Sequence, residues 1–200
     1  MAPEFSSEEC RWLTVGIGGL TGVEEVISKK YPNCKIYGID PVNPGNFSEI
    51  GKLLKVGVGL KDGILPATTE DESIKIISLP RLLDEFVHSR LIHYLSIDIE
   101  SYEMIILLEI LKNGKFGNEN ITFCQIDIEL HDPKKGIPLP EAANLNRAKW
   151  VLDFIAVPSP YLPIFTVSYT PAHKVTFVNT ENLECEKAFK IKSTIRTSIS

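Results

Sequence analysis

Short apolar runs alternate with amphipathic segments along most of the chain. Apolar runs bounded by turn-forming residues predict buried strands over 11–17, 35–40, 55–60, 74–78, 91–99 and 121–130. Apolar residues three and four positions apart predict helices over 22–31, 46–55, 79–89, 102–112 and 139–156. Two further strands, 163–169 and 174–179, follow each other around a turn at 170–173. This order predicts an α/β fold with a mostly parallel sheet, helices on both faces and an antiparallel hairpin at the end.

Two of the predicted strands carry polar side chains at every second position. In "SIDIE" (96–100) and "QIDIELH" (125–131) the polar residues alternate with Ile and Leu, so each strand has one polar face. A strand on the protein surface would also explain this pattern. In a parallel sheet covered on both faces, however, an unpaired buried carboxylate costs several kcal/mol. We therefore expect Asp98, Glu100, Glu129 and His131 at the carboxyl ends of their strands, where such sheets bind ligands.

A glycine-rich turn follows the first predicted strand. In "TVGIGG", Gly16, Gly18 and Gly19 would let a ligand approach the backbone before the next helix begins. Asp40 ends the second strand, where a carboxylate can accept hydrogen bonds from ribose hydroxyls. The dinucleotide pattern G-x-G-x-x-G is not met, because Thr21 occupies its last position. The turn thus favours S-adenosylmethionine over a dinucleotide, and a tight turn without any ligand is the alternative.

Three stretches resemble the class I S-adenosylmethionine-dependent methyltransferases, and among them the FkbM type. They are "LTVGIGGLTG" (13–22), "YGIDP" (37–41) and "SLPRLLDEFVHSRLIHYLSIDIESYEMIILLEIL" (78–111), and the strand "FCQIDIELH" (123–131) follows. Asp98, Glu100 and Glu103 match the three acidic positions of the family motif in the third stretch. The resemblance covers residues 11–180. It implies one methyltransferase-like domain over 1–200, a Rossmann-like three-layer sandwich with a seven-stranded sheet, and frayed ends at 1–10 and 185–200.

The resemblance also implies a function, namely O-methylation of a small-molecule or sugar hydroxyl with S-adenosyl-L-methionine as cofactor. Cofactor-binding residues would be Gly16, Gly18, Gly19, Asp40 and Asp98, with Asp40 on the ribose and Asp98 nearest the methyl group. Glu100, Glu129 and His131 would lie on the acceptor side, and the catalytic set would be Asp98, Glu100 and His131. The ordinary pKa of a histidine suits His131 to act as a base near neutrality.

Several positions depart from the family pattern. Thr14, Leu20, Pro80, Ser96 and Ser101 replace an acid, a glycine, an aspartate, a lysine and a glycine, respectively. These departures leave open a catalytically inactive binding protein with the same fold. A nicotinamide-dependent oxidoreductase is a further alternative, which the missing third glycine disfavours. The carboxylates could also bind Mg²⁺ or Ca²⁺, but the resemblance implies no metal.

Composition narrows the partners that we expect. A net charge of −5 argues against nucleic acid, and the acceptor is expected to be a small molecule. No run approaches the length of a membrane span, and the N-terminal residues do not resemble a signal peptide, which suggests a cytoplasmic protein if the chain is complete. The four cysteines, Cys10, Cys34, Cys124 and Cys185, form no C-x-x-C pair, which disfavours a zinc ribbon or a thioredoxin-like site. Cys34 and Cys124 lie beside predicted strands, so we interpret these two as buried thiols, which suits a reducing compartment.

Overall fold

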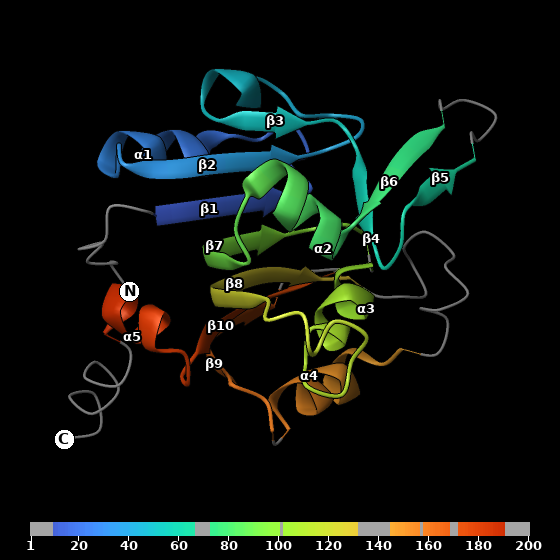
Figure 1. The fold of residues 1–200 in the computed structure, drawn as a ribbon, viewed down its shortest axis with the longest axis vertical. Coiled ribbons are helices and arrows are strands. Elements are labelled where there is room, and N and C mark those ends of the chain that lie inside the picture. Colours follow the sequence, from blue (N-terminus) through green and yellow to red (C-terminus); the bar gives the residue numbers. More distant parts are fainter. Residues whose placement is uncertain are drawn as a thin grey trace.

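The main sheet of the protein has seven strands. The computed structural model describes residues 10–66, 73–100, 102–131, 145–156, 158–168 and 172–190. The strands, in spatial order, are β3 (Lys52–Leu54), β2 (Cys34–Ile39), β1 (Cys10–Val15), β7 (Leu91–Ile97), β8 (Thr122–Leu130), β10 (His173–Asn179) and β9 (Tyr161–Ser168). The first five are parallel, and β10 is antiparallel to both of its neighbours. The predicted Rossmann-like fold is confirmed (Figure 1).

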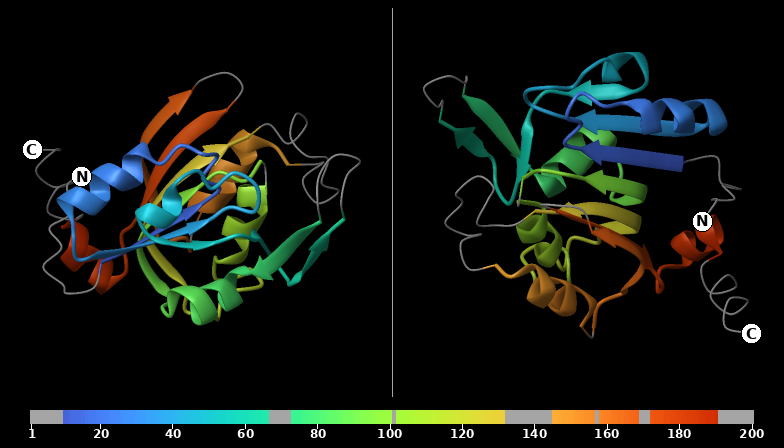
Figure 2. Two further views of the ribbon diagram at one scale, coloured as in Figure 1. Left: turned by 90° about the horizontal axis from the view of Figure 1, so that it is seen from above. Right: turned by 180° about the vertical axis from the view of Figure 1, so that it is seen from behind.

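Helices cover both faces of this sheet (Figure 2). On one face lie α2 (Leu79–Leu82), which continues as η2 (Leu83–Val87), then α3 (Tyr102–Glu109) and α4 (Arg147–Ile155). Their apolar side chains pack with the sheet into the main core, which includes Leu83, Met104, Trp150 and Phe154. On the other face, α1 (Gly22–Lys30) covers a smaller cluster around Trp12. Burial of both faces is what the alternation of strands and helices predicted.

A second, three-stranded sheet lies beside the carboxyl ends of the main parallel strands (Figure 1). It consists of β4 (Gly57–Gly59), β6 (Ile74–Ser78) and β5 (Gly63–Leu65). The strand predicted at 55–60 therefore belongs to this small sheet, and β5 is a strand that the sequence pattern did not predict. The small sheet forms one wall of the cavity described below.

The helix predicted at 46–55 is wrong. The chain forms a short turn, η1 (Phe47–Glu49), and then strand β3, which pairs with β2. Phe47 is fully buried against Gly38, and Gly51 approaches β2 so closely that a Cβ would lie 2.4 Å from the carbonyl oxygen of Ile36. Pairing at the sheet edge thus outweighs the helical spacing of the apolar residues.

The inward face predicted for the first helix is also wrong in part. The apolar spacing predicts Val23, Val26 and Ile27 facing the sheet, but Val23 and Val26 are 60% and 61% exposed. Glu24 is buried instead, and its Oε1 accepts a hydrogen bond from the Thr14 hydroxyl at 2.7 Å. A polar contact with β1 therefore sets the rotation of α1.

The cysteines and the C-terminal segment differ from the prediction. Cys10 is joined to Cys34, and Cys124 to Cys185, so the four residues are not free thiols. Residues from 185 on were expected to fray, but Leu183–Phe189 form α5, capped by the side chain of Asn182. The disulfide of Cys185 ties α5 to β8 at the end of the sheet opposite the small sheet (Figure 1).

Some predictions fall outside the described residues, namely the start of the helix at 139–156, part of the turn at 170–173, and fraying at 1–9 and 191–200. In the part of the chain that the structure describes, no helix is long and apolar enough to cross a membrane.

Candidate active site

The glycine turn after β1 brings the ends of two neighbouring strands together. Gly16 and Gly18 have φ angles of 82° and 60°, in the left-handed region that side chains with a Cβ rarely adopt. A Cβ on Gly16 would lie 1.8 Å from the carbonyl oxygen of Asp98. The backbone N–H of Asp98 in turn donates to the carbonyl of Val15 at 2.9 Å. Glycine at position 16 therefore allows the turn to lie directly against the end of β7.

Asp40 connects this turn to the loop after β2. Its Oδ2 accepts the backbone N–H groups of Ile17 and Gly18 at 2.8 and 3.0 Å. Its Oδ1 accepts those of Val42 and Asn43 at 2.8 and 2.7 Å. Burial raises the pKa of Asp40, but these four hydrogen bonds outweigh it and hold the pKa below the ordinary value of 3.8. Both carboxylate oxygens are thus already used by the protein backbone.

Four of the five predicted cofactor residues, Gly16, Gly18, Asp40 and Asp98, border one cavity of about 610 Å³. Glu100 lines the same cavity, and Gly16 lies directly against the backbone of Asp98. Residues that the sequence did not single out complete the wall, and they come from the small sheet and the start of α3: Gly57, Val58, Leu65, Ile74, Ile76 and Tyr102. Only the tertiary arrangement brings these residues here. Among the described residues, Gly19 is not part of this lining, because it lies against the side chain of Asn43.

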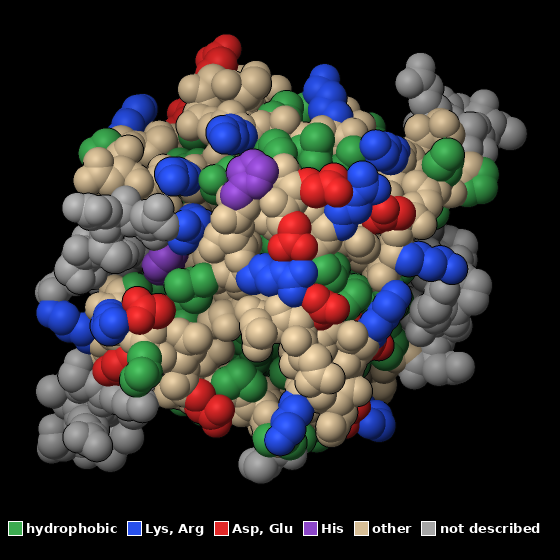
Figure 3. All heavy atoms as spheres, in the orientation of Figure 1, with side chains coloured by type: hydrophobic (Ala, Val, Ile, Leu, Met, Phe, Trp, Pro, Cys, Tyr) green, Lys and Arg blue, Asp and Glu red, His purple; other side chains and the backbone are tan. Residues whose placement is uncertain are grey.

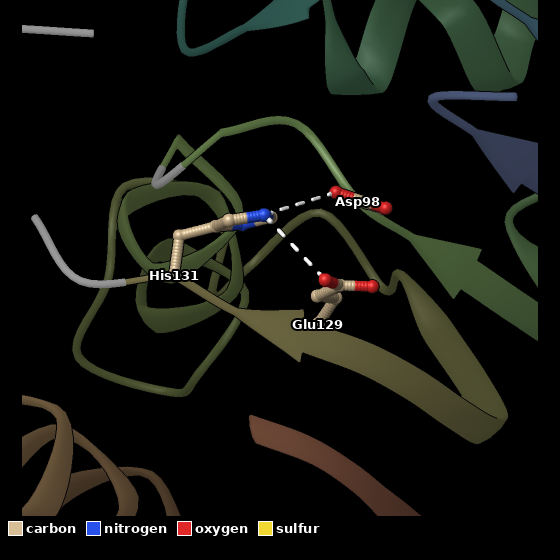
Figure 4. Close-up of side chains that lie close together, drawn as sticks. All are labelled: Asp98, Glu129 and His131. Atoms are coloured by element: carbon tan, nitrogen blue, oxygen red, sulfur yellow. Dashed lines mark ion pairs between the residues drawn. The ribbon is translucent and has the colours of Figure 1, made fainter. Parts of the chain in front are cut away.

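At the end of the cavity marked by Asp98, acidic side chains surround His131. Its Nε2 lies 3.5 Å from Asp98 Oδ1, 3.7 Å from Glu100 Oε2 and 3.7 Å from Glu129 Oε1. Asp98, Glu129 and His131 come from the ends of β7 and β8, and these three side chains point toward one another (Figure 4). Glu100 has a φ angle of 54°, which is unusual for a residue with a Cβ. The structure thus brings together Asp98 and the three predicted acceptor-side residues, Glu100, Glu129 and His131.

A fifth charged residue, Glu103, lies behind the histidine. It belongs to the first turn of α3 and is fully buried. Its Oε1 lies 3.2 Å from Nδ1 of His131. This hydrogen bond raises the pKa of His131 to about 9, although burial of the ring opposes the change. The imidazole is therefore protonated at neutral pH in the isolated chain, which does not support the predicted role of His131 as a base.

The environment of Asp98 also changes its protonation. Burial raises the pKa of Asp98 to about 6, and the negative charge of Glu129 adds to the effect. The positive charge of His131 acts in the opposite direction. A carboxylate with such a raised pKa, in a cavity, is typical of a functional site.

Other polar residues on the same faces of β7 and β8, Tyr94 and Asp127, take part in packing. The hydroxyl of Tyr94 donates to Asp127, and the ring of Tyr94 stacks on Trp12 with 3.5 Å between the ring centroids. The indole N–H of Trp12 donates to Thr14, which donates to Glu24. A buried carboxylate thus lies beside position 14, where the family pattern has an acid, but it comes from α1.

No family model and no curated protein sequence matches the chain. Solved structures resemble its backbone at low identity. The METTL16 MTase domain is 10% identical with a TM-score of 0.49, and the match covers 88% of this chain and 62% of that domain. The plantazolicin methyltransferase BpumL in complex with SAH is 12% identical with a TM-score of 0.47, covering 90% and 77%. The chain thus spans less than two thirds of the METTL16 domain.

A third similar structure bears on the expected partners. It is a mutant of the 16S rRNA (adenine(1408)-N(1))-methyltransferase from Catenulisporales acidiphilia, with 10% identity, a TM-score of 0.41 and coverage of 85% and 84%. The expectation of a small-molecule acceptor without nucleic acid is therefore corrected, since an rRNA methyltransferase is among the similar structures. Acidic and basic side chains are interspersed on the face of the molecule that Figure 3 shows.

The order of the strands identifies the fold. Parallel strands β3-β2-β1-β7-β8 are followed in space by β10, the one antiparallel strand between β8 and the edge strand β9. The glycine turn and Asp40 lie at the carboxyl ends of β1 and β2, and open α/β sheets bind ligands at this edge. The chain has the Rossmann-like fold of the class I methyltransferases.

Proposed function

We propose that the protein is an S-adenosylmethionine-dependent methyltransferase of the FkbM type, which transfers a methyl group to a hydroxyl oxygen such as that of a sugar. One observation carries this proposal. A single cavity of about 610 Å³ is lined by the glycine turn, Asp40, Asp98 and Glu100. The sequence between 78 and 111 supports the FkbM type, because it places three acidic residues where that family has them.

The cofactor would lie between the glycine turn and the end of β7. Gly16 and Gly18 leave room for the adenosyl and methionine parts beside the backbone. Asp40 accepts four backbone N–H groups and so holds the two loops that border the cofactor. A direct hydrogen bond between Asp40 and the ribose would have to replace one of these, since a carboxylate offers about four acceptor sites. We therefore assign Asp40 chiefly to the positioning of the loops.

Methyl transfer needs the acceptor oxygen in line with the bond between sulfur and the methyl carbon, about 3 Å from the carbon. As the new C–O bond forms, the S–C bond breaks and its electron pair stays on sulfur, which becomes neutral. The hydroxyl proton passes to a carboxylate of the cluster around His131 and then to water. Glu100 provides the route outward, because its side chain is 60% exposed. Asp98 lies at the cavity wall, where its charge can stabilise the sulfonium.

Calorimetric titration with S-adenosylhomocysteine and, separately, with NADH tests the cofactor. We expect S-adenosylhomocysteine to bind at one site per chain and NADH not to compete with it. Binding of NADH without binding of S-adenosylhomocysteine would instead identify a nicotinamide-dependent protein. If S-adenosylhomocysteine binds, transfer of a radiolabelled methyl group from S-adenosylmethionine to pools of sugars and RNA then distinguishes an enzyme from an inactive binding protein.

A further inference from the structure

We propose that Asp98, Glu129 and His131 bind a divalent metal cation at the acceptor end of the cavity. The sequence resemblance implied no metal, so this inference revises that expectation. The binding of the cation can be tested without any cofactor. Its role in catalysis, which is to hold and activate the acceptor hydroxyl, rests on the proposed methyltransferase function.

The first argument is the spacing of the three donor atoms. One oxygen from each carboxylate and one imidazole nitrogen all lie within 4.8 Å of one another. The distances from Nε2 of His131 to Asp98 Oδ1 and Glu129 Oε1, 3.5 and 3.7 Å, are longer than an ordinary hydrogen bond. Two ligands at about 2.1–2.3 Å from one ion, at octahedral or tetrahedral angles, lie roughly 3.0–3.8 Å apart. The two distances from Nε2 therefore fit ligands that share one cation, and the three side chains point toward one another (Figure 4).

The second argument is the orientation of the imidazole. Glu103, which is not one of the three donors, is buried, and its Oε1 lies 3.2 Å from Nδ1 of His131. Metal-binding histidines almost always have such a partner on the second ring nitrogen. Nε2 consequently points at the two carboxylates, and its contacts with them, at 3.5 and 3.7 Å, are longer than ordinary hydrogen bonds. A cation bound there would replace the proton of Nε2 in these contacts.

The third argument is the distribution of charge. Four carboxylates, those of Asp98, Glu100, Glu103 and Glu129, lie within 3.7 Å of the ring nitrogens of His131. Lys174 contacts Glu129, but at Oε2, at 3.4 Å, and its side chain is 59% exposed. Oε1 of Glu129 is the oxygen that faces His131. A divalent cation bound there would offset the excess of negative charge.

The donor set also indicates which cation fits. Two carboxylates and one imidazole suit a first-row divalent ion, for which Mn²⁺ is a practical probe. Three protein ligands leave coordination positions open for water or an acceptor oxygen. A bound cation lowers the pKa of a coordinated hydroxyl and so makes its oxygen a better nucleophile. We therefore infer that the acceptor binds through its hydroxyl oxygen to the cation.

The test is a titration of the whole chain with MnCl₂, followed by the electron paramagnetic resonance signal of free Mn²⁺. We expect one Mn²⁺ per chain, and affinity at least about tenfold weaker in His131→Gln and in Asp98→Asn. Asp153→Asn is the matched control, because it removes a carboxylate of α4 that pairs with Lys149. This control should bind Mn²⁺ like the unaltered chain. Circular dichroism verifies folding, and Glu129→Gln replaces any variant that does not fold.

The outcomes separate this proposal from the proposed function. Absence of Mn²⁺ binding, or unchanged affinity in the folded variants, overturns the metal site. A parallel titration with S-adenosylhomocysteine in the presence of a chelator tests the cofactor alone. If Mn²⁺ binds as expected and S-adenosylhomocysteine does not, the metal site stands and the methyltransferase function falls. If only S-adenosylhomocysteine binds, the function stands and the metal site is overturned.

Discussion

Glu103 Oε1 lies 3.3 Å from the backbone nitrogen of His131 and 3.2 Å from its Nδ1. The other oxygen of Glu103 accepts the backbone N–H of Ile99 at 3.3 Å. Ile99 follows the end of β7 and His131 follows the end of β8. One buried carboxylate at the start of α3 thus joins the ends of both strands and sets the position of Asp98 and His131.

Replacing Glu103 by Ala should therefore destabilise the protein strongly. Two backbone N–H groups would lose their acceptor, and each unsatisfied buried group costs about 1–3 kcal/mol. We expect the free energy of unfolding to fall by about 2–5 kcal/mol, measured by urea denaturation. Glu85→Ala, which removes an exposed partner of Arg81, should cost less than about 1 kcal/mol. Equal effects of the two changes would contradict the role given to Glu103.

Asp40→Asn should weaken both the stability and the cofactor affinity, because an amide nitrogen cannot accept the two N–H bonds of one carboxylate oxygen. The folded-state pKa of Asp40 is lowered, so its contribution is fully present above the unfolded pKa of about 3.8 and is lost as pH falls through the folded value. We expect the difference in unfolding free energy between the original chain and Asp40→Asn to be constant from pH 7 to pH 5. It should shrink below pH 4. A difference that grows on acidification would contradict the assigned contacts.

Gly16→Ala tests the close approach of β1 and β7. The new methyl group would lie 1.8 Å from the carbonyl of Asp98 in a conformation with positive φ, so the two strand ends must separate. We expect S-adenosylhomocysteine affinity to fall more than about tenfold, together with a loss of more than about 2 kcal/mol in stability. Gly22→Ala at the start of α1 is the control, since a Cβ there meets no atom within 4 Å. Similar behaviour of both variants would argue against this geometry.

The two disulfides predict sensitivity to reduction. Cys10–Cys34 and Cys124–Cys185 close loops with sequence separations of 24 and 61 residues. Loss of one such cross-link typically lowers the free energy of unfolding by about 2–4 kcal/mol. The melting temperature then falls by several degrees for each disulfide lost. Mass spectrometry without reductant should find no free thiol, and the double variant Cys124→Ala with Cys185→Ala should melt earlier. Free thiols in protein purified under oxidising conditions would contradict the pairing.

The two disulfides also concern the cellular compartment in which the chain folds. Disulfides are typical of oxidising compartments. We therefore propose an oxidising compartment in place of the cytoplasmic one expected from the N-terminal sequence. Fractionation of expressing cells, with a thiol-reactive label added before lysis, would find labelled cysteines only if the protein resides in a reducing compartment.

The sequence predicted the features that depend on local order along the chain. Alternation of polar and apolar residues at 96–100 and 125–131 located Asp98, Glu129 and His131 correctly, because the strand period fixes the face of each side chain. The glycine turn and Asp40 were found because parallel strands end at the same edge of the sheet. These residues meet in space as expected, although their roles in binding remain predictions.

Features that depend on distant partners could not be predicted in this way. The apolar residues at 46–55 have helical spacing. The later part of this segment nevertheless forms strand β3, because it pairs with β2. The rotation of α1 depends on the contact between Glu24 and Thr14. The pairing of Cys124 with Cys185 requires that α5 fold back onto β8. Glu103 matched an acidic position of the family, but nothing in the sequence indicated that it would lie against His131.

A crystal structure of the chain soaked with S-adenosylhomocysteine tests the central claim most directly. We predict the adenosyl group in the cavity of about 610 Å³, with its ribose near Asp40 and its sulfur toward Asp98. The sulfur should face the open space beside Glu129 and His131, where the acceptor would enter. Density for the ligand at another surface, or a well-ordered cavity that stays empty at millimolar ligand, would contradict the account.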